Sequence, residues 1–379
     1  MGQRVRVAIV GLGFGAEFIP IYQRHPDAEL VAICRRDRGG VDEVGDAFGI
    51  EKRYTSYEEV LADPDVDAIH INTPIPEHAQ QSIAALRAGK HVACTVPMAT
   101  SLEDCKAIID AARTAGKNYM MMETVVYSRE FLYAQELARS GALGRIQFLR
   151  GSHQQEMGGW PGYWEGLPPM HYATHAVSPL LTLAGHSAAA VSCVGSGRID
   201  EALIGRYGSP FAIESAHLRL HDSDLAAEVT RSLFNTAREY RESFDVYGSL
   251  KSFEWEQTQD AGFVVFTGET PERVEIPDFA DRLPEEIRSF TTHGVYDEEN
   301  AHLSFVQGSG HGGSHPHLVH EFVSSIVEGR HAAIDEVTAA NWTGVGIAAH
   351  ESAMQQGAWV ELPAYTLRHR GLAVQQRGR

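Results

Sequence analysis

The chain is poor in cysteine and has no long apolar run. Its four cysteines are Cys34, Cys94, Cys105 and Cys193, and their spacings form no CxxC pair of the kind that binds zinc or exchanges disulfides. We therefore expect buried free thiols in a reducing cytoplasm. No apolar run approaches the roughly 18 residues of a membrane span. The first residues run directly into a strand-like segment at 4–10, so no signal peptide is expected.

Positive charge is also scarce. The 32 Lys and Arg residues stand against 50 Asp and Glu residues, which gives a formal net charge of −18. An excess of negative charge disfavours nucleic acid and anionic membranes as partners. We therefore expect neither of them as a partner. The net charge says little about a small-molecule substrate, because a pocket can carry a local charge of the opposite sign.

Strand-like and helical segments alternate over the first 125 residues, and this alternation predicts βαβ units with a parallel sheet. The expected strands are 4–10, 30–35, 67–73, 90–95 and 118–124, and the expected helices are 14–24, 57–62, 77–88 and 102–115. After residue 125 a helix at 129–140 precedes a series of strand-like runs joined by turn-like stretches, which favours an antiparallel sheet. Two late helices, 317–328 and 337–356, are expected to cover one face of it.

A glycine-rich turn joins the first strand to the first helix. The segment Gly11-Leu-Gly13-Phe14-Gly15-Ala16 has the spacing of a dinucleotide fingerprint in the right context. Gly11 permits the tight turn, Gly13 lets a pyrophosphate approach the backbone, and Ala16 takes the packing position. The sequence therefore predicts a dinucleotide-binding domain over residues 1–125.

The end of the second predicted strand departs from the usual pattern. An acidic residue normally binds the ribose hydroxyls there, whereas this chain has Arg35 and Arg36 followed by Asp37. The arginines fit the 2′-phosphate of NADP, or they stack on adenine while NAD binds and Asp37 takes the role of the carboxylate. Solvated loop charges are the structural alternative.

Asn72-Thr73-Pro74, His78 and the segment AGKHV at 88–92 follow in register. With them the chain resembles, over nearly its whole length, the glucose–fructose oxidoreductase / inositol dehydrogenase (Gfo/Idh/MocA) family. The resemblance implies a Rossmann domain at 1–125 and a substrate-binding and oligomerisation α+β domain at 126–367, with a tail at 368–379. It also implies a mostly antiparallel open sheet whose free face builds a homodimer or homotetramer. Thr95 and Pro97 complete the expected cofactor contacts.

Three later segments are similar to one branch of that family. MMETVVYSR at 121–129, HYATH at 171–175 and GHGG at 310–313 resemble the NAD-dependent glycoside hydrolases, such as the bacterial N-acetylgalactosaminidases. Dehydrogenases of the family carry Glu-Lys-Pro where this chain has Thr95-Val96-Pro97, and the hydrolases carry Glu-Val-Pro. The chain shares the missing lysine with the hydrolases, whereas Thr95 matches neither group.

The hydrolase chemistry needs no net oxidant. When C3 of the sugar is oxidised to a ketone, the hydrogen at C2 becomes acidic and a base can remove it. The substituent at C1 then leaves, water adds back, and C3 is reduced again, which makes such enzymes exceptions to the two-carboxylate rule. A cofactor that is regenerated in each cycle favours NAD, and this is the cofactor that we expect.

The acid–base groups are expected among histidine, tyrosine and glutamate. His175 matches the histidine that the family places beside the reacting carbinol, and Tyr172 would share its side of a helix. His311 lies in the glycine-rich loop at 310–313, and Glu123 lies at a strand end, where α/β ligands bind. The alternatives are a core histidine, a packed tyrosine and a structural ion pair.

Other residues are expected to contact the substrate. They are Tyr127, His153, Trp164 and His171. His171 and His175 have the i, i+4 spacing of zinc ligands, yet no adjacent glutamate completes HExxH. We therefore expect no metal.

The stretch 235–241 contributes Arg238, Tyr240 and Arg241, and the two arginines fit an anionic substituent. The N-acetylgalactosaminidases place an arginine before the Tyr…His pair, and this chain has none between Trp160 and His175. A sulfoquinovoside, which carries a sulfonate, is therefore the favoured named substrate, with uncharged hexosides and glucuronides as alternatives. Solvated surface charge is the structural alternative for the arginines.

Two other functions compete with a glycosidase. An ordinary NAD(P)-dependent sugar or polyol dehydrogenase would fit Arg35 and Arg36 if they bind NADP, and a nucleotide-binding scaffold would fit the missing lysine. The retained His175, His311 and Glu123 argue against loss of catalysis.

Overall fold

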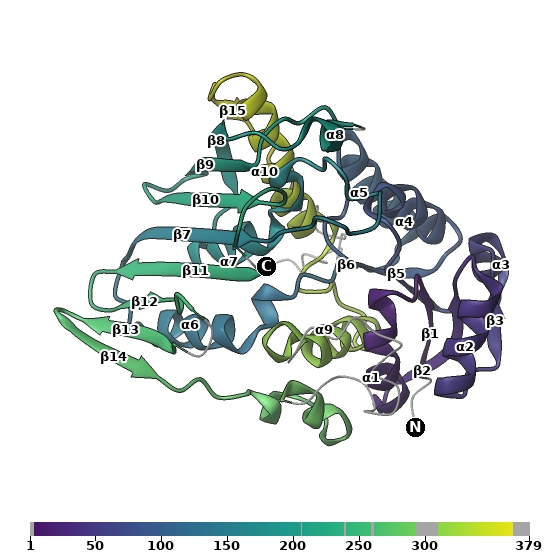
Figure 1. Cartoon of the computed structure of the whole chain (residues 1–379). Helices are drawn as coiled ribbons and strands as arrows, with labels where there is room; N and C mark the ends of the chain where they lie inside the picture. Colours follow the sequence, from purple (N-terminus) through teal and green to yellow (C-terminus); the bar gives the residue numbers. More distant parts are fainter. Residues whose placement is uncertain (1–3, 206, 239, 259–260, 293–309, 367–379) are drawn as a thin grey trace, which may run out of the picture.

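The computed structural model describes residues 4–205, 207–238, 240–258, 261–292 and 310–366. The predicted tail at 368–379 lies outside the described residues. The chain folds around two sheets with helices packed against them (Figure 1). The first sheet is parallel and the second is mostly antiparallel, which confirms the predicted fold class. No helix among the described residues is long and apolar enough to cross a bilayer.

The first sheet has the strand order β3-β2-β1-β4-β5-β6. β4 and β6 are buried at every position and consist of apolar residues except for His70, as expected where helices cover both faces of a sheet. The strands are β1 (Val5–Val10), β2 (Ala28–Cys34), β3 (Lys52–Tyr54), β4 (Ala68–Ile71), β5 (His91–Cys94) and β6 (Tyr119–Met121). The helices between them, with η for 3-10 helices, are η1 (Phe14–Phe18), α1 (Ile19–Arg24), α2 (Arg38–Phe48), α3 (Tyr57–Ala62), η2 (Ile75–Glu77), α4 (His78–Arg87) and α5 (Leu102–Ala115).

The sequence does not predict α2 or β3. Glycines at positions 39, 40 and 45 lower the helix propensity of α2. The helix forms because Asp37 caps it, accepting a hydrogen bond of 2.7 Å from the backbone N–H of Gly40, and because one face of it is buried. β3 has only three residues, all half-buried, so it gives no periodic signal.

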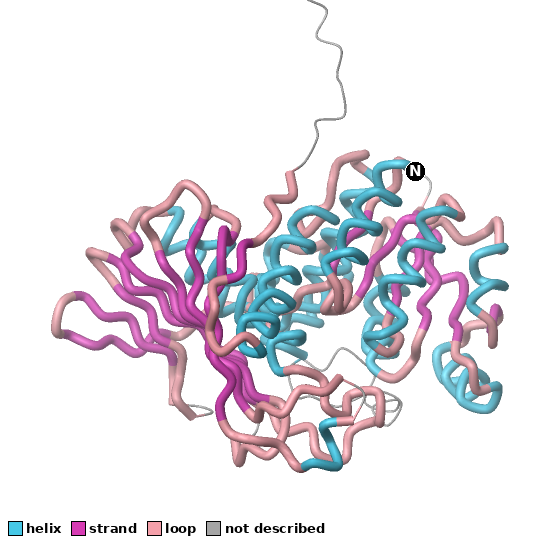
Figure 2. Tube along the Cα trace, turned by 90° about the horizontal axis from the view of Figure 1, so that it is seen from above, coloured by secondary structure: helices cyan, strands magenta, loops and turns pink. Residues whose placement is uncertain are grey.

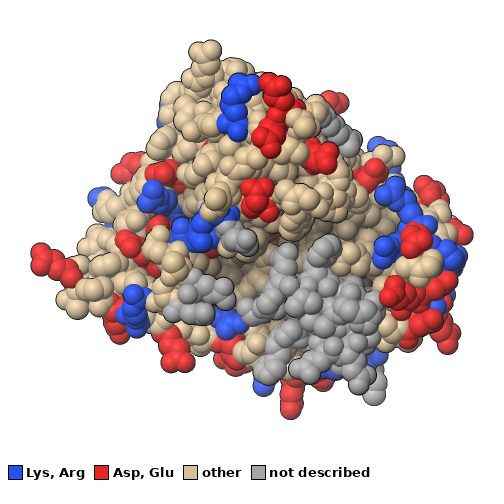
Figure 3. Space-filling view, in the orientation of Figure 1, with Lys and Arg blue, Asp and Glu red and all other residues tan. Residues whose placement is uncertain are grey.

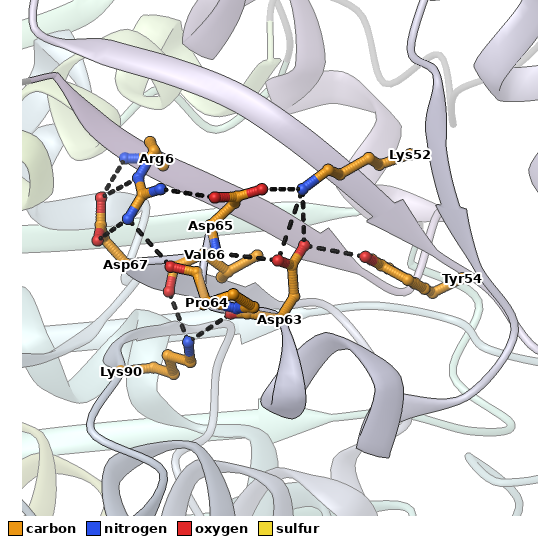
Figure 4. Close-up of polar contacts among 9 residues, drawn as sticks. All are labelled: Arg6, Lys52, Tyr54, Asp63, Pro64, Asp65, Val66, Asp67 and Lys90. Carbon is orange, nitrogen blue, oxygen red and sulfur yellow. Dashed lines mark hydrogen bonds and ion pairs between the residues drawn. The ribbon is translucent and has the colours of Figure 1, made fainter.

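A polar network ties the amino ends of these strands together (Figure 4). Arg6 of β1 contacts Asp67 at 2.9 Å, and Lys52 of β3 contacts Asp65 at 2.6 Å. The buried Lys90 donates two hydrogen bonds of 2.7 Å to backbone carbonyls of the same loop. The exposed ion pairs contribute little stability, but the network occupies the amino edge and leaves the carboxyl ends of the strands for a site.

The second sheet has the order β14-β13-β12-β11-β7-β10-β9-β8-β15, and its described pairs are antiparallel except β7 with β10. Its strands are β7 (Ile146–Gln154), β8 (Ala188–Ser196), β9 (Ile213–Leu220), β10 (Ala226–Ser232), β11 (Arg241–Gly248), β12 (Ser252–Glu254), β13 (Phe263–Thr267), β14 (Thr270–Val274) and β15 (Val360–Glu361). The helices of this part are η3 (Val125–Tyr127), α6 (Arg129–Arg139), η4 (Pro169–Tyr172), α7 (Thr174–Ala184), α8 (Glu201–Ile204), η5 (Ala280–Arg282), η6 (Glu285–Thr291), α9 (Gly310–Val327) and α10 (Glu336–Met354).

Helices pack on one side of the second sheet, and its other side is open (Figure 2). α7 and α10 lie on the packed side, against β7 and β8. The late helices were expected to cover the sheet together, and α10 does so. α9 instead packs on η3, η6 and α1, at the junction of the two sheets. It carries the 310–313 segment to the edge of the first sheet.

Candidate active site

A cavity of about 760 Å³ lies between the two sheets, at the carboxyl ends of β1, β2, β4 and β5. Parallel α/β sheets bind their ligands at this edge. The cavity runs from the arginines after β2 to the histidine at the start of α7. Of the residues predicted for the site, it is lined by Gly11, Gly13, Phe14, Arg35, Arg36, Asn72, Thr73, Pro74, His78, Thr95, Trp164, Tyr172, His175, Tyr240 and His311.

The glycine-rich turn forms one end of the cavity. Gly11 has a φ of +88°, and a Cβ there would lie 2.5 Å from the carbonyl oxygen of Asn72. A Cβ on Gly15 would lie 2.9 Å from the side chain of Ile9 and 3.1 Å from that of Asn72. Ala16 is fully buried beneath the turn. The buried Oδ1 of Asn72 has no partner in the described structure. The close approach of the backbone fits the phosphate end of a dinucleotide, whereas the open Asn72 acceptor suits a donor such as a ribose hydroxyl.

Arg35 and Arg36 lie at the far end of the cavity. A Cβ on Gly40 would lie 2.7 Å from both the Arg35 guanidinium carbon and Oδ2 of Asp37. The Asp37 carboxylate therefore lies beside α2 and accepts from its backbone. Acidic and basic side chains are interspersed over α2 and α3 at the adjoining edge of the molecule (Figure 3).

The middle of the cavity wall is formed by the ends of β4 and β5. Thr73, Pro74 and Thr95 line it, while Pro97 is buried behind it. The imidazole of His78 joins the two ends, with each ring nitrogen 2.8 Å from a backbone carbonyl, those of Thr73 and Pro97.

His175 and Glu123 form a buried pair at the other end of the cavity. Nδ1 of His175, in the first turn of α7, lies 2.6 Å from Oε1 of Glu123, which follows β6. Nε2 lies 3.4 Å from the hydroxyl of Tyr172. With Nδ1–H donating to the carboxylate, Nε2 keeps its lone pair and can accept a proton. Burial disfavours the charged ring, but Glu123 and Glu242 outweigh it and raise the pKa of His175.

Glu242 is a member of the site that the sequence analysis missed. Its Oε1 accepts a hydrogen bond from the Tyr240 hydroxyl, and lies 3.5 Å from Nδ1 of His311 and 3.7 Å from Nε2 of His175. The Tyr240 hydroxyl is also 2.9 Å from Nδ1 of His311. Burial raises the pKa of Glu242, but the neighbouring histidines more than offset this and hold it well below its usual value.

Three adjacent strands build the layer behind this cluster. His153 of β7 pairs in register with Glu242 of β11 on one side and with Arg231 of β10 on the other. His153 is fully buried, and its ring lies 5.1 Å from that of His175. Arg231 donates to the carbonyls of Tyr172 and His153 and to Gln155. The guanidinium is thus engaged in holding the segment that carries Tyr172. Arg231 also escaped the sequence analysis.

An aromatic wall closes the substrate end. Trp160, Tyr163 and Trp164 line the cavity, and Trp164 meets the ring of Tyr172 edge-on at 4.9 Å. Such apolar faces with polar edges suit the faces of a sugar ring.

Four residues predicted to contact substrate lie elsewhere. Tyr127 lines a second cavity behind η3 and stacks on His317. His171 is buried and meets His350 of α10 edge-on at 5.1 Å. Arg241 lines a third cavity with Arg150 and Asp245, and Arg238 donates to the carbonyl of Gln257. Their role in substrate binding stays a prediction without support from this placement.

One group of side chains in the site has the spacing of metal ligands. His153, His175 and Glu242 bring ligand atoms within 4.8 Å of one another. However, Nε2 of His175 already faces Tyr172, and Glu242 accepts from Tyr240. We interpret the group as an acid–base cluster, and the expectation of no metal stays a prediction.

Comparison with known proteins gives the same assignment for the first sheet. Residues 5–123 match the model of the Gfo/Idh/MocA group, described as an oxidoreductase family with an NAD-binding Rossmann fold. The match assigns an NAD-binding Rossmann fold to this part of the chain. The chain also resembles an NAD-binding oxidoreductase from Klebsiella pneumoniae, with a TM-score of 0.78 and 20% identity, covering 95% of this chain and 100% of that one. That likeness shows the fold.

Curated relatives carry glycosidase names. An alpha-N-acetylgalactosaminidase from Shewanella oneidensis is 32% identical over 198 residues, and a glycosyl hydrolase family 109 protein from Shewanella baltica is 31% identical over the same length. Each match covers 46% of this chain and 43% of the relative. The matched segment therefore spans less than half the length of the curated relatives.

Proposed function

We propose that this chain, whose residues 5–123 match the NAD-binding Rossmann fold of the Gfo/Idh/MocA oxidoreductases, is an NAD-dependent glycoside hydrolase. One observation carries the proposal. One end of the cavity brings together two adjoining acid–base groups, the His175–Glu123 pair and the cluster of Tyr240, Glu242 and His311, and the chain has no lysine at positions 95–97. A dehydrogenase needs a single proton acceptor at the carbinol, whereas elimination at a neighbouring carbon needs more.

The reaction divides among these groups. Bound NAD would accept a hydride from C3 of the sugar at the start of the cycle and return it at the end. Nε2 of His175 removes the proton of the C3 hydroxyl, and Glu123 stabilises the imidazolium that forms. The cluster of Tyr240, Glu242 and His311 serves the later proton transfers, because it presents a hydroxyl and an imidazole on one side of the cavity.

The elimination step balances without an outside oxidant. Loss of the C2 proton leaves an electron pair that forms the C1–C2 double bond. The C1–O bond breaks with its electrons on the aglycone oxygen, which takes up a proton. Water then adds its hydroxyl to C1 and a proton returns to C2. The net change is hydrolysis of the glycoside.

The charge of the cavity bears on the substrate. The sulfoquinovoside prediction depended on Arg238 and Arg241, and neither lines the cavity. Among the described residues that line it, the arginines are Arg35 and Arg36, at the nucleotide end. Arg231, close to the substrate end, has its donors engaged by backbone carbonyls and Gln155. We therefore propose an uncharged hexoside, with the sulfoquinovoside kept in the test panel.

Hydrolysis in deuterated water tests the mechanism. The proposal predicts a sugar product that carries deuterium at C2, read by mass spectrometry and by proton NMR. Hydrolysis without deuterium at C2 would contradict elimination. A 3-keto sugar released with its aglycone still attached, and reduced cofactor in equal amount, would identify a plain dehydrogenase.

The assembly is part of the proposal. The open side of the second sheet (Figure 2) presents polar and small residues, among them Ser152, Ser215 and Thr230, that are only half-buried. We propose that this face forms the interface of a homodimer or homotetramer. Light scattering of the full chain checks this, and a monomer at working concentration would contradict it.

A further inference from the structure

The imidazole of His78 is placed where both ring nitrogens face acceptors. His78 begins α4 and is almost fully buried. Nδ1 lies 2.8 Å from the carbonyl oxygen of Pro97, and Nε2 lies 2.8 Å from that of Thr73. A carbonyl oxygen accepts hydrogen bonds and cannot donate one. Both contacts are favourable only if each ring nitrogen carries a hydrogen, which makes the ring a cation.

The hydroxyl of Thr95 is a further polar neighbour of the ring, and it does not supply a donor. The hydroxyl of Thr95 lies 3.5 Å from Nε2, but it donates its hydrogen to the carbonyl of Ile71 at 3.2 Å. It therefore presents lone pairs to the ring, as the two carbonyls do. A neutral ring would place a nitrogen lone pair against a carbonyl lone pair in this pocket.

We propose that His78 is held as a doubly protonated, positively charged ring that fixes the ends of β4 and β5 in the arrangement that binds NAD. Thr73 and Thr95 line the cavity at these two strand ends. Two charge-assisted hydrogen bonds from one buried ring hold them at a set separation, and such bonds are about twice as strong as neutral ones. His78 is thus a positioning residue. The inference depends on the NAD-binding fold and not on the glycosidase activity.

His70 of the same β4 strand shows that burial alone does not charge a histidine here. It is equally buried, but Nδ1 faces the Tyr22 hydroxyl at 3.3 Å and Nε2 has no partner. Burial lowers the pKa of His70 to about 3. Burial acts in the same direction on His78, yet the Cys94 thiol and the two carbonyls outweigh it and raise its pKa to about 9.

The groups around the ring define the pH range of the effect. Cys94, at the end of β5, is the titratable group that faces His78, and Tyr57 and Tyr119 lie against the same thiol. Burial raises the pKa of both tyrosines far above the working range. Loss of the His78 proton near pH 9 would therefore remove one of the two hydrogen bonds and loosen the strand ends.

Nitrogen-15 NMR of the full chain labelled at histidine tests the protonation state directly, in the absence of NAD. The His78 signals are assigned by their loss in H78Q or, should that variant not fold, in H78N. We expect two N–H groups on this ring from pH 6 to pH 8 and conversion to one near pH 9. A single N–H at pH 7 would overturn the proposal.

NAD affinity, measured by calorimetry, tests the positioning role. We expect H78Q to bind NAD about tenfold more weakly than the wild type at pH 7.5, because the charge-assisted bonds are lost. The wild-type affinity should fall between pH 8 and pH 10, and that of H78Q should stay level. H70Q is the matched control, because His70 is equally buried on β4 but is neutral, and it should bind NAD within about threefold of the wild type. Equal affinity of H78Q and wild type at pH 7.5 would refute the role.

Discussion

Nδ1 of His175 lies 2.6 Å from Oε1 of Glu123, and both side chains are almost fully buried. The pair joins the carboxyl end of the last strand of the first sheet to the first turn of α7. It fixes the tautomer in which Nε2 faces the cavity as a proton acceptor. The geometry thus makes Glu123 a determinant of both the orientation and the basicity of His175.

Replacing Glu123 by glutamine should lower kcat by about 100-fold, the lower range for a positioned acid–base group. The wild-type enzyme needs a neutral His175, so its activity falls as pH drops through the raised pKa of that ring. Without the carboxylate that pKa falls, and the acidic limb of the kcat/KM profile should move to lower pH.

E214Q is the matched control for E123Q. Glu214 forms a buried pair with His350 at 2.7 Å, outside the cavity. E214Q should leave the position of the acidic limb unchanged. An unmoved limb in E123Q would show that His175 is not the group that titrates.

Replacing Glu242 by glutamine should reduce kcat by about 10- to 100-fold, and it should also lower the free energy of unfolding, because the depressed pKa of the carboxylate stabilises the folded state at neutral pH. The carboxylate accepts from Tyr240, lies beside His311 and helps to raise the pKa of His175. E228Q is the control, because Glu228 lies on β10 beside Arg150 and outside the cavity. Steady-state kinetics on both variants checks this, and equal rates for E242Q and wild type would remove Glu242 from the mechanism.

Buried neutral histidines should make the fold acid-labile. Burial lowers the pKa of His25 and His317 to about 4, and that of His70 and His171 to about 3. Their contribution to stability is complete above the unfolded value near 6.5 and is lost as pH falls below it. Protonation of each ring should lower the free energy of unfolding by about 2–3 kcal/mol at pH 4.5.

Urea midpoints at pH 7.5 and pH 5 measure this loss. H70Q should flatten the pH dependence, whereas H217Q, at an exposed position on β9, should not. Equal midpoints of the wild type at the two pH values would contradict the assignment of neutral rings.

Activity should survive removal of divalent cations. The cluster of His153, His175 and Glu242 has the spacing of metal ligands, yet Nε2 of His175 faces the Tyr172 hydroxyl and Glu242 accepts from Tyr240. Dialysis against a chelator, with NAD restored afterwards, should leave kcat within about twofold. A loss that added manganese or zinc reverses would identify the cluster as a metal site instead.

Local patterns predicted much of the fold and part of the site. The turn at 11–16 and the Tyr172–His175 pair lie within short segments, so the spacing of their residues along the chain is enough to predict their geometry. Tyr172 and His175 come together because η4 and α7 are nearly continuous. His171 is one residue away from Tyr172 and points to α10 instead.

The residues that the sequence missed or misplaced lie on strands. Tyr240 lines the cavity and donates to Glu242 behind it, while Arg241 faces the opposite side of the sheet, because side chains alternate along a strand. The sequence analysis grouped Tyr240 with Arg238 and Arg241 by proximity along the chain. Glu242 becomes recognisable only through its register with His153, which depends on the non-local pairing of β11 with β7.

The ratio of released aglycone to reduced cofactor tests the central claim most directly. The full chain would be incubated with a catalytic amount of NAD and a panel of nitrophenyl hexosides, including the sulfoquinovoside, while nitrophenol and NADH absorbance are followed together. The account predicts nitrophenol in large excess over NAD, with no lasting NADH. NADH formed in proportion to substrate, with the glycosidic bond intact, would contradict it.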